Sequence, residues 1–231
     1  MPAFNRLDVL NSMIRVGFMP LFFHKDLEVA VRIIDACVAG GARVVEFTNR
    51  GDNAYRVFSD LMVHFTKACP ELILGVGSVL DPATAALYIS SGANFIVGSV
   101  LNPEVARICN RRKVPYIPGC ATPSEISQAE ELGVEIVKIF PADTMGGPKF
   151  VKAILGPTPW TRIMPTGGVE PTRESLAGWF NAGVCMVGIG SNLVRKEWVD
   201  SGDYEAITTL VSQVVAMIQD IRDEISKKGK A

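Results

Sequence analysis

Short apolar runs alternate with amphipathic stretches along the whole chain. Each run is typical of a buried strand, and each is followed by a helix-start signal or by the apolar spacing of a helix. Eight such runs recur every ~20–30 residues, which is the spacing of βα units in an eight-fold barrel. We expect strands at residues 17–23, 43–47, 72–76, 94–97, 115–117, 135–139, 162–164 and 185–188.

Three of the expected helices begin with a capping residue directly before a proline, at Asp81-Pro82, Asn102-Pro103 and Thr122-Pro123. Proline suits the first helical position, and a capping side chain binds a free backbone amide. Glu125 completes a capping box, since its side chain can reach back to the Thr122 amide. This regular pattern predicts an α/β fold, a closed (β/α)8 TIM barrel. A doubly wound open sheet is the rival architecture, but eight units in 231 residues favour closure.

Helices are expected at both ends of the chain. Leu7, Leu10 and Ile14 give an extra N-terminal helix with one apolar face. Near the C-terminus a longer apolar stripe has helical spacing, and we expect it to pack on the barrel wall. The stripe consists of Ile207, Leu210, Val211, Val214, Val215, Ile218, Ile221 and Ile225. No long, low-complexity or Ser/Gly-rich segment is present, so we interpret residues 1–231 as a single barrel domain.

The composition is sufficient for a large hydrophobic core and argues against nucleic-acid and membrane partners. Apolar residues are 48% of the chain, and the net charge of −1 gives no reason to expect a nucleic-acid or membrane partner. The five cysteines are scattered without a Cys-x-x-Cys pair, as in a reducing compartment. No signal peptide or membrane-length apolar stretch is visible, so we expect a soluble cytoplasmic protein. His24 and His64 lack metal-ligand spacing, so no metal or other cofactor is expected.

Lys138 is the first candidate for chemistry, because it interrupts the apolar run 135–139. Strand alternation places it on the same face as Ile136 and Phe140. Burial disfavours an ammonium and lowers its pKa, which releases the free amine that attacks carbonyl substrates. The alternative is a structural lysine that reaches water or pairs with a carboxylate. The strand pattern alone leaves both interpretations open.

Glu46 is the second anomaly, a carboxylate inside the apolar strand 43–47. Strand alternation places it on one face with Val44 and Thr48. Burial would raise its pKa toward the range useful for proton transfer. A structural interpretation makes it the ion-pair partner of Lys138, and the two interpretations are compatible.

In a barrel the active site lies at the carboxyl ends of the strands. Arg50 at such a position suits a carboxylate ligand, although surface loop arginines are equally common. The glycine-containing loops at 166–168 and 188–191 lead toward helices and expose backbone amides where barrels hold phosphate. The residues selected by this rule are Glu46, Thr48, Arg50, Ser78, Lys138, Thr166, Gly167, Gly168, Gly190 and Ser191, with Cys120 as a further pocket-lining candidate.

Several ordered segments carry a resemblance to one enzyme family. They are Val-Val-Glu-Phe-Thr-Asn-Arg at 44–50, Gly-Val-Gly-Ser-Val-Leu at 75–80, Pro-Gly at 118–119, Lys-Ile-Phe-Pro-Ala-Asp at 138–143, Gly-Gly at 146–147 and Pro-Thr-Gly-Gly-Val at 165–169. From Gly17 to Val194 the chain resembles the 2-keto-3-deoxy-6-phosphogluconate (KDPG) aldolases, also called 4-hydroxy-2-oxoglutarate (KHG) aldolases. The resemblance implies a trimeric, metal-independent class I aldolase on a (β/α)8 barrel.

The resemblance also implies a role for each selected residue. Lys138 would form a Schiff base with the substrate keto group, and Glu46 would relay protons. The remaining roles are Arg50 and Ser78 for the pyruvate carboxylate, Phe140 and Thr166 for the pyruvyl site, and Gly167, Gly168 and Ser191 for the distal phosphate. Three segments depart from the family pattern, namely 21–24, Asn49 and 97–100, and we expect them to border the aldehyde side of the pocket.

The implied reaction cleaves 2-dehydro-3-deoxy-6-phosphogluconate to pyruvate and D-glyceraldehyde 3-phosphate. Cleavage of 4-hydroxy-2-oxoglutarate to pyruvate and glyoxylate is a second implied activity, and 2-dehydro-3-deoxy-6-phosphogalactonate is an alternative substrate. A phosphate-binding barrel isomerase or synthase would use Lys138 only as an acid, a base or an anion ligand. The last alternative is a non-catalytic sugar-phosphate binding protein, which the joint presence of Lys138, Glu46 and Arg50 disfavours.

Overall fold

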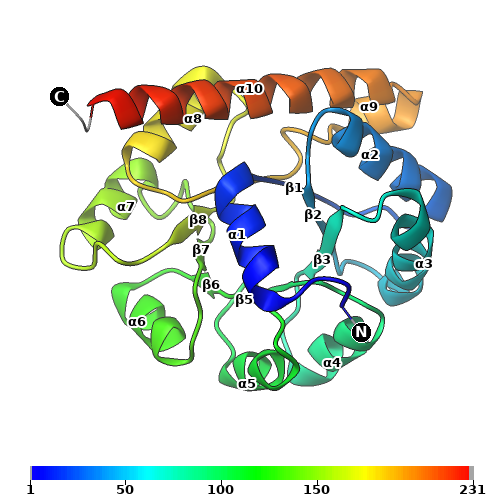
Figure 1. Cartoon of the computed structure of the whole chain (residues 1–231), viewed down its shortest axis with the longest axis horizontal. Helices are drawn as coiled ribbons and strands as arrows, with labels where there is room; N and C mark the ends of the chain where they lie inside the picture. Colours follow the sequence, from blue (N-terminus) through cyan, green and yellow to red (C-terminus); the bar gives the residue numbers. More distant parts are fainter. Residues whose placement is uncertain (1, 229–231) are drawn as a thin grey trace.

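A computed structural model describes residues 2–228, whose strands form a ring surrounded by helices (Figure 1). The pairings between neighbouring strands are parallel. Strands and helices alternate along the chain, as the hydrophobic pattern predicts. The strands are β1 (Phe18–Phe22), β2 (Val44–Thr48), β3 (Ile73–Gly77), β4 (Ile96–Val97), β5 (Tyr116–Ile117), β6 (Gly119–Cys120), β7 (Val137–Ile139), β8 (Ile163–Pro165) and β9 (Val187–Ile189).

The ring of strands is closed. Hydrogen bonding gives the order β5-β4-β3-β2-β1-β9 in one sheet and β6-β7-β8 in another. The two sheets meet where Thr166, after β8, bridges Gly188 of β9, and where β5 continues into β6 across Pro118. Proline has no amide hydrogen, so it interrupts the ladder at this point. The predicted (β/α)8 barrel is therefore confirmed, and the doubly wound open sheet is wrong.

Four of the eight predicted strands are shorter than the apolar runs that predicted them. The sixth and eighth predicted strands begin at Val137 and Val187, two residues after the start of each run at 135 and 185. The fifth extends beyond the predicted 115–117, since β6 follows Pro118 in the same wall position. Hydrophobic runs include buried residues that flank a ladder, so they mark strand centres better than strand ends.

The helices begin at the predicted caps. Asp81 Oδ1 accepts the Thr84 amide at 2.9 Å. The Glu125 side chain reaches back over the predicted cap, where it accepts the Ala121 amide and the Thr122 hydroxyl, each at 2.9 Å. The helices are α1 (Arg6–Val16), α2 (Leu27–Ala39), α3 (Ala54–Ala68), α4 (Pro82–Ser90), α5 (Pro103–Arg112), α6 (Pro123–Glu131), α7 (Gly147–Leu155), α8 (Arg173–Asn181), α9 (Lys196–Ser201) and α10 (Tyr204–Lys228).

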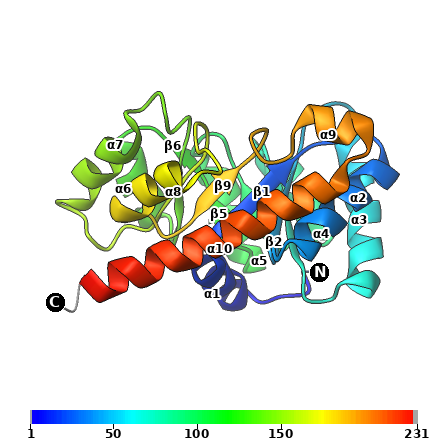
Figure 2. The ribbon, with the colours of Figure 1, turned by 90° about the horizontal axis from the view of Figure 1, so that it is seen from above.

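The extra N-terminal helix closes one end of the barrel. α1 crosses the ring at the amino-terminal ends of the strands (Figures 1 and 2) and buries Val9, Leu10 and Met13 there. The predicted apolar face is wrong at Leu7, which is 67% exposed, because the face formed by Val9 and Met13 meets the barrel interior. The interior core that packs on α1 consists of Met19, Val44, Ile73, Phe95, Val97, Ile117, Ile136, Met164 and Met186.

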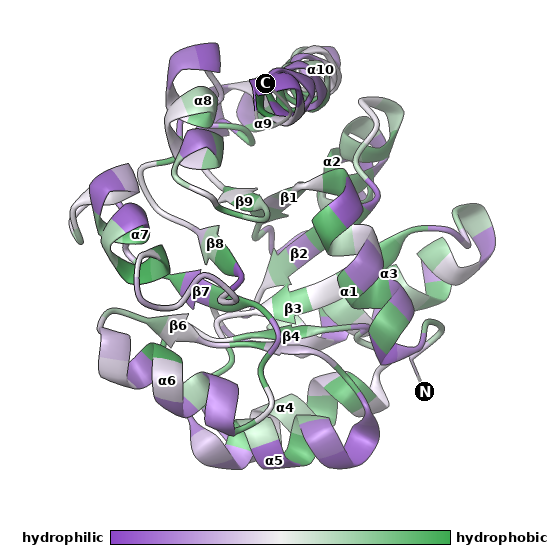
Figure 3. Cartoon of the chain, turned by 60° about the vertical axis from the view of Figure 1, so that its left-hand side comes forward, coloured by the Kyte–Doolittle hydropathy of each residue, from purple (hydrophilic) through white to green (hydrophobic). Residues whose placement is uncertain are grey.

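A second core fills the space between the strands and the outer helices. Residues that alternate with the interior ones, such as Val45 and Phe47 of β2, belong to this outer core. The strands are largely apolar and the helices carry many polar residues (Figure 3). The predicted C-terminal stripe is confirmed in α10, which lies along α2 and α8 more than on the strands (Figure 1). Within residues 2–228, no helix has both the length and the apolar character needed to cross a membrane.

Candidate active site

A cavity of about 520 Å³ opens at the carboxyl ends of the strands, opposite the end that α1 covers. Glu46 and Lys138 are not part of its lining, because each lies two residues earlier in its strand than the lining residues Thr48 and Phe140. Ser78, after β3, is also outside the lining. The predicted site residues that line the cavity are Thr48, Arg50, Phe140, Thr166, Gly167, Gly168, Gly190 and Ser191.

Glu46 and Lys138 project into the barrel from opposite walls. In the closed ring, three wall strands separate β2 from β7 in either direction. Both side chains face inward, since Val44 and Ile136, two residues earlier on the same faces, belong to the interior core. Glu46 and Lys138 therefore lie directly above the apolar interior core, on the side of the strands' carboxyl ends.

The Lys138 side chain is buried without an anionic partner. The residue is 5% exposed, and its Nζ lies 4.9 Å from the centroid of the Phe140 ring. Among residues 2–228, no carboxylate lies within 4.0 Å of this amine. Burial lowers the pKa of Lys138, Arg50 lowers it further, and only Glu46 opposes these effects. The structural interpretation as half of an ion pair is thus not supported.

The Glu46 carboxyl group is buried in the same way. It is 1% exposed, and its Oε2 has no hydrogen-bond partner among the described residues. Burial raises the pKa of Glu46, while Lys138 and Arg50 oppose the rise. The pKa values of Glu46 and Lys138 therefore move toward each other, which favours an uncharged amine and a carboxyl group able to exchange protons.

Thr166, which lines the cavity, presents a second buried polar atom. Its Oγ1 has no partner in the part of the chain that the structure describes. A Cβ atom on Gly188 would come within 2.7 Å of this oxygen, so glycine in β9 makes room for the hydroxyl. Buried polar atoms normally have partners, and an exception inside a cleft is a position that a polar substrate atom can satisfy.

The two glycine loops meet at the cavity rim. The backbone amides of Gly168, Gly190 and Ser191 have no acceptor within residues 2–228. No long helix begins at either loop, because α8 starts at Arg173 and α9 spans six residues. The free amides at the rim therefore belong to the loops and not to the first turn of a helix, and their use as anion donors remains a prediction.

The predicted site residues at the ends of β2 and β3 agree with the structure to different degrees. Arg50 is exposed at the rim and lines the cavity, as expected. The Thr48 hydroxyl donates to the Phe22 carbonyl at 3.2 Å, which leaves its oxygen as an acceptor only. Ser78 is half-buried with a left-handed backbone (φ 60°), a conformation that non-glycine residues adopt mainly at constrained sites. The contact of Ser78 with the pyruvate carboxylate of the substrate remains a prediction.

The aromatic segment 21–24 borders the cavity, as the departure from the family pattern predicted. His24 Nδ1 accepts the Asp26 amide at 3.1 Å, so this histidine also shapes its own loop. Cys120 was a wrong candidate, because Gly119 faces inward and Cys120 faces the outer core, where burial raises its pKa to about 12. No motif or periodicity marks the lining residues Asn192, Val194, Lys196 and Asp200, which belong to an irregular loop and a short helix.

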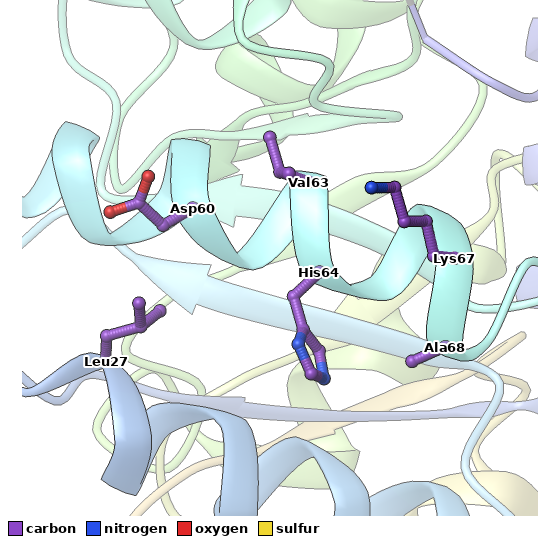
Figure 4. Close-up of a pocket in the computed structure, with 6 residues that line it drawn as sticks. All are labelled: Leu27, Asp60, Val63, His64, Lys67 and Ala68. Atoms are coloured by element: carbon purple, nitrogen blue, oxygen red, sulfur yellow. The ribbon is translucent and has the colours of Figure 1, made fainter.

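A second hollow, of about 590 Å³, lies between α2 and α3 and carries none of the predicted site residues (Figure 4). His64 lies there on α3 as an exposed helix residue, in agreement with its sequence pattern. Within residues 2–228, no group of three or more His, Cys, Asp and Glu side chains is arranged to hold a metal ion. The strand-end cavity is therefore the candidate active site.

Comparisons with known proteins agree with this geometry. The family model described as KDPG and KHG aldolase matches residues 9–210. The KHG/KDPG aldolase of Escherichia coli (strain K12) is 37% identical over 208 residues, which cover 89% of this chain and 94% of that protein. The 2-dehydro-3-deoxy-phosphogluconate aldolase of Haemophilus influenzae is 30% identical over 219 residues, covering 94% and 100%.

One solved structure adds direct chemical information. The KDPG aldolase of Legionella pneumophila, crystallised with pyruvate captured as a covalent carbinolamine intermediate, has a TM-score of 0.80. It is 29% identical and covers 88% of this chain and 97% of that one. The fold, the buried amine and these relatives together define a class I aldolase, a lyase that works through a Schiff base. The chain belongs to the KDPG and KHG aldolase family.

Proposed function

We propose that this chain cleaves 2-dehydro-3-deoxy-6-phosphogluconate into pyruvate and D-glyceraldehyde 3-phosphate. The observation that carries the proposal is the buried, unpaired Lys138 amine facing Glu46 beneath a rim of free loop amides. The names of the Escherichia coli and Haemophilus influenzae relatives support the same substrate. Lys138 and Glu46 are the catalytic residues in this proposal.

The first half of the reaction builds an electron sink. The uncharged Lys138 amine attacks the C2 keto carbon while Glu46 protonates the keto oxygen, and the amine then returns one proton to Glu46. Glu46 protonates the resulting hydroxyl group, which leaves as water, and a protonated imine remains. Burial moves the pKa of Lys138 down and that of Glu46 up, which is the direction toward these two starting forms, a neutral amine and a protonated carboxyl group.

The second half breaks the carbon–carbon bond. The Glu46 carboxylate takes the proton of the C4 hydroxyl, the C3–C4 bond breaks, and its electrons move into the enamine formed with Lys138. The aldehyde leaves, Glu46 returns the proton to C3, and water hydrolyses the imine to release pyruvate and the free amine. The chemistry requires no metal, since the protonated imine stabilises the developing carbanion.

Three groups orient the pyruvyl half of the substrate. Arg50 binds the carboxylate from the rim, where a planar guanidinium can donate two parallel hydrogen bonds. Ser78 assists Arg50 from the end of β3. Phe140 and Thr166 line the keto side, and the unpaired Thr166 hydroxyl supplies a polar contact in an otherwise apolar wall.

The rim amides of Gly167, Gly168, Gly190 and Ser191 bind the distal phosphate. This supports the phosphorylated substrate over 4-hydroxy-2-oxoglutarate, whose cleavage we expect as a slower second activity. The galactonate epimer is an alternative substrate, since the two sugar acids carry the same carboxylate and phosphate. An isomerase, a synthase or a binding protein would not need a buried lysine without an ion-pair partner.

Reductive trapping tests the proposed chemistry. The protein is incubated with pyruvate, reduced with borohydride and digested, and the adduct is mapped by mass spectrometry. We expect the adduct on Lys138 and none in Lys138→Arg, which keeps the charge but not an accessible neutral amine. An intact wild-type protein without any adduct would overturn the Schiff-base assignment.

Parallel cleavage assays test the substrate. The kcat/KM values for the gluconate and galactonate phosphates, for the unphosphorylated sugar acid and for 4-hydroxy-2-oxoglutarate are compared. We expect the gluconate phosphate to have the highest value. Equal values with and without the phosphate would remove the proposed role of the glycine loops.

We also propose that residues 1–231 form one domain, that the protein is a cytoplasmic homotrimer, and that it has no nucleic-acid or membrane partner. The exposed side chains Leu80, Leu87 and Val100 support association, because subunit contact would remove them from water. Light scattering during size-exclusion chromatography tests the trimer, and a single cooperative unfolding transition tests the domain. A monomer at micromolar concentration would contradict the trimer.

A further inference from the structure

Lys196 places an ammonium group at the rim of the candidate active site. It is the first residue of α9 and lines the same cavity as Gly190 and Ser191. Its side chain is 86% exposed, and its ion pair is with Asp200, which also lines the cavity. The mechanism proposed above gives neither residue a role.

The short helix itself does not account for this lysine. A cation in the first turn opposes the helix dipole, which favours acidic residues at that end. An ion pair between Lys196 and Asp200, with the cation four residues before the anion, also has the less favourable orientation. Both side chains are largely exposed, so the pair contributes little to stability. Local stability therefore gives no reason for a cation here.

The neighbouring cation is engaged differently. The Arg195 guanidinium lies 4.5 Å from the centroid of the Trp198 ring, and its Nε donates to the Asn192 carbonyl at 3.4 Å. Arg195 is thus held by an aromatic ring and a backbone carbonyl, whereas Lys196 contacts only the exposed Asp200 carboxylate. Of these two adjacent cations, Lys196 is the one that can turn to a ligand.

The carboxylates and the free amides beside the glycine loops differ in their hydrogen bonding. Glu170 accepts a hydrogen bond from the Asn192 side chain at 3.0 Å, and Asp143 accepts a neighbouring backbone amide. The loop amides of Gly168, Gly190 and Ser191, in contrast, have no acceptor within residues 2–228. The carboxylates beside the loops have partners, while the amide donors do not.

We propose that Lys196 is a specificity-determining residue that binds the distal phosphate of the substrate. In the free protein Asp200 holds the ammonium at the rim. When the ligand arrives, its dianionic group replaces Asp200 and joins the loop amides around one phosphate. The inference rests on the proposed function for the identity of the substrate, but the cation site itself requires only a phosphate-bearing ligand.

Kinetics with Lys196→Met test the inference. We expect kcat/KM for the phosphorylated sugar acid to fall about tenfold, because one charge-assisted hydrogen bond is lost. The value for the unphosphorylated sugar acid and the yield of the borohydride–pyruvate adduct on Lys138 are expected to stay at wild-type levels. Asp200→Asn removes the competing anion, so kcat/KM for the phosphorylated substrate is expected to rise about two- to fivefold.

Lys67→Met is the matched control, since Lys67 is an exposed lysine of the hollow between α2 and α3 (Figure 4). It is expected to leave both substrates unaffected. Equal losses on both substrates in Lys196→Met, or a loss in Asp200→Asn as large as in Lys196→Met, would overturn the inference. A loss in Asp200→Asn as large as in Lys196→Met would mean that the ion pair only stabilises α9.

Calorimetric titration with D-glycerol 3-phosphate, using glycerol as the blank, separates the inference from the proposed function. This probe requires no Schiff base. We expect Lys196→Met to bind it about tenfold more weakly than the wild type. Unchanged binding overturns the role of Lys196 even if the aldolase is confirmed. Weaker binding supports the cation site even if pyruvate fails to form an adduct.

Discussion

The Glu46 carboxylate occupies the space that a side chain on Gly77 would need. The two residues lie on the neighbouring strands β2 and β3, where Thr48 pairs with Gly77. A Cβ atom on Gly77 would collide with Oε1 and with the carboxylate carbon of Glu46. Since Oε2 has no hydrogen-bond partner among the described residues, the missing side chain at Gly77 helps to set where the carboxylate lies.

Gly77→Ala is expected to displace Glu46 and to lower kcat about 100-fold, the order of loss caused by a misplacement of about 1 Å in a catalytic group. Steady-state kinetics check the effect, and thermal unfolding checks that the barrel is intact. Gly156→Ala is the control, because Gly156 has a right-handed helical backbone and its nearest Cβ contact would be 3.6 Å. A wild-type kcat in Gly77→Ala would show that the Glu46 carboxylate can move aside without loss of its catalytic function.

Strand alternation predicted which residues share a face at the centre of this site. In a strand the direction of a side chain follows from its position along the backbone, so Glu46 shares a face with Val44, and Lys138 shares one with Ile136. The structure adds that both faces point into the barrel interior. The same rule applied to Cys120 would have excluded it, because Gly119 and Cys120 must face opposite ways. That error came from selecting residues by their place after a strand without checking the strand face.

The rim of the cavity was predictable only in part. Gly167, Gly168, Gly190 and Ser191 were found because glycines after strands have a known use, but Lys196 was not. The path of the chain after β9 depends on a turn closed by hydrogen bonds from two amides to the Gly190 carbonyl, at 2.9 and 3.0 Å. No periodicity describes such a turn, so the sequence cannot show which later side chains return to the cavity.

The pKa of Lys138 is expected to respond in opposite directions to its two charged neighbours. Glu46→Gln removes the charge that raises this pKa, so the titration midpoint moves to lower pH. Arg50→Gln removes a charge that lowers it, so the midpoint moves to higher pH. An NMR titration with ¹³C-labelled lysine measures both shifts without requiring catalysis. Shifts of the same sign in both variants would contradict this electrostatic description.

A hydrogen bond between Tyr88 and Asn49 is expected to position Arg50. The hydroxyl of the buried Tyr88 donates to Asn49 Oδ1 at 2.8 Å. The backbone N–H of Asn49 donates to the Gly77 carbonyl, also at 2.8 Å. Tyr88→Phe leaves the Asn49 oxygen without this donor, so we expect a loss of about 1 kcal/mol in the free energy of unfolding. With Arg50 less well held, KM for the keto acid is expected to rise about threefold or more, with kcat little changed.

The double variant Asn49→Leu with Tyr88→Phe separates positioning from general damage. Replacing both polar partners by apolar groups is close to neutral, so stability and KM are expected to return toward wild-type values. Chemical denaturation and steady-state kinetics on the single and double variants give both quantities. A fall in kcat at unchanged KM in Tyr88→Phe would place the effect on another step.

Arg222 of α10 ties together three elements at the closed end of the barrel. Its guanidinium donates to the carbonyls of Arg15 and Cys185 at 2.8 and 2.6 Å and lies 5.0 Å from the Phe180 ring centroid. Arg222→Met is expected to lower the free energy of unfolding by about 1–3 kcal/mol with kcat/KM unchanged, because the catalytic mouth is at the other end. Arg173→Met, which removes exposed ion pairs to α10, is expected to change stability by about 0.5 kcal/mol or less. Chemical denaturation ranks the two variants, and equal losses would mean that the two carbonyl contacts of Arg222 add nothing beyond surface charge pairing.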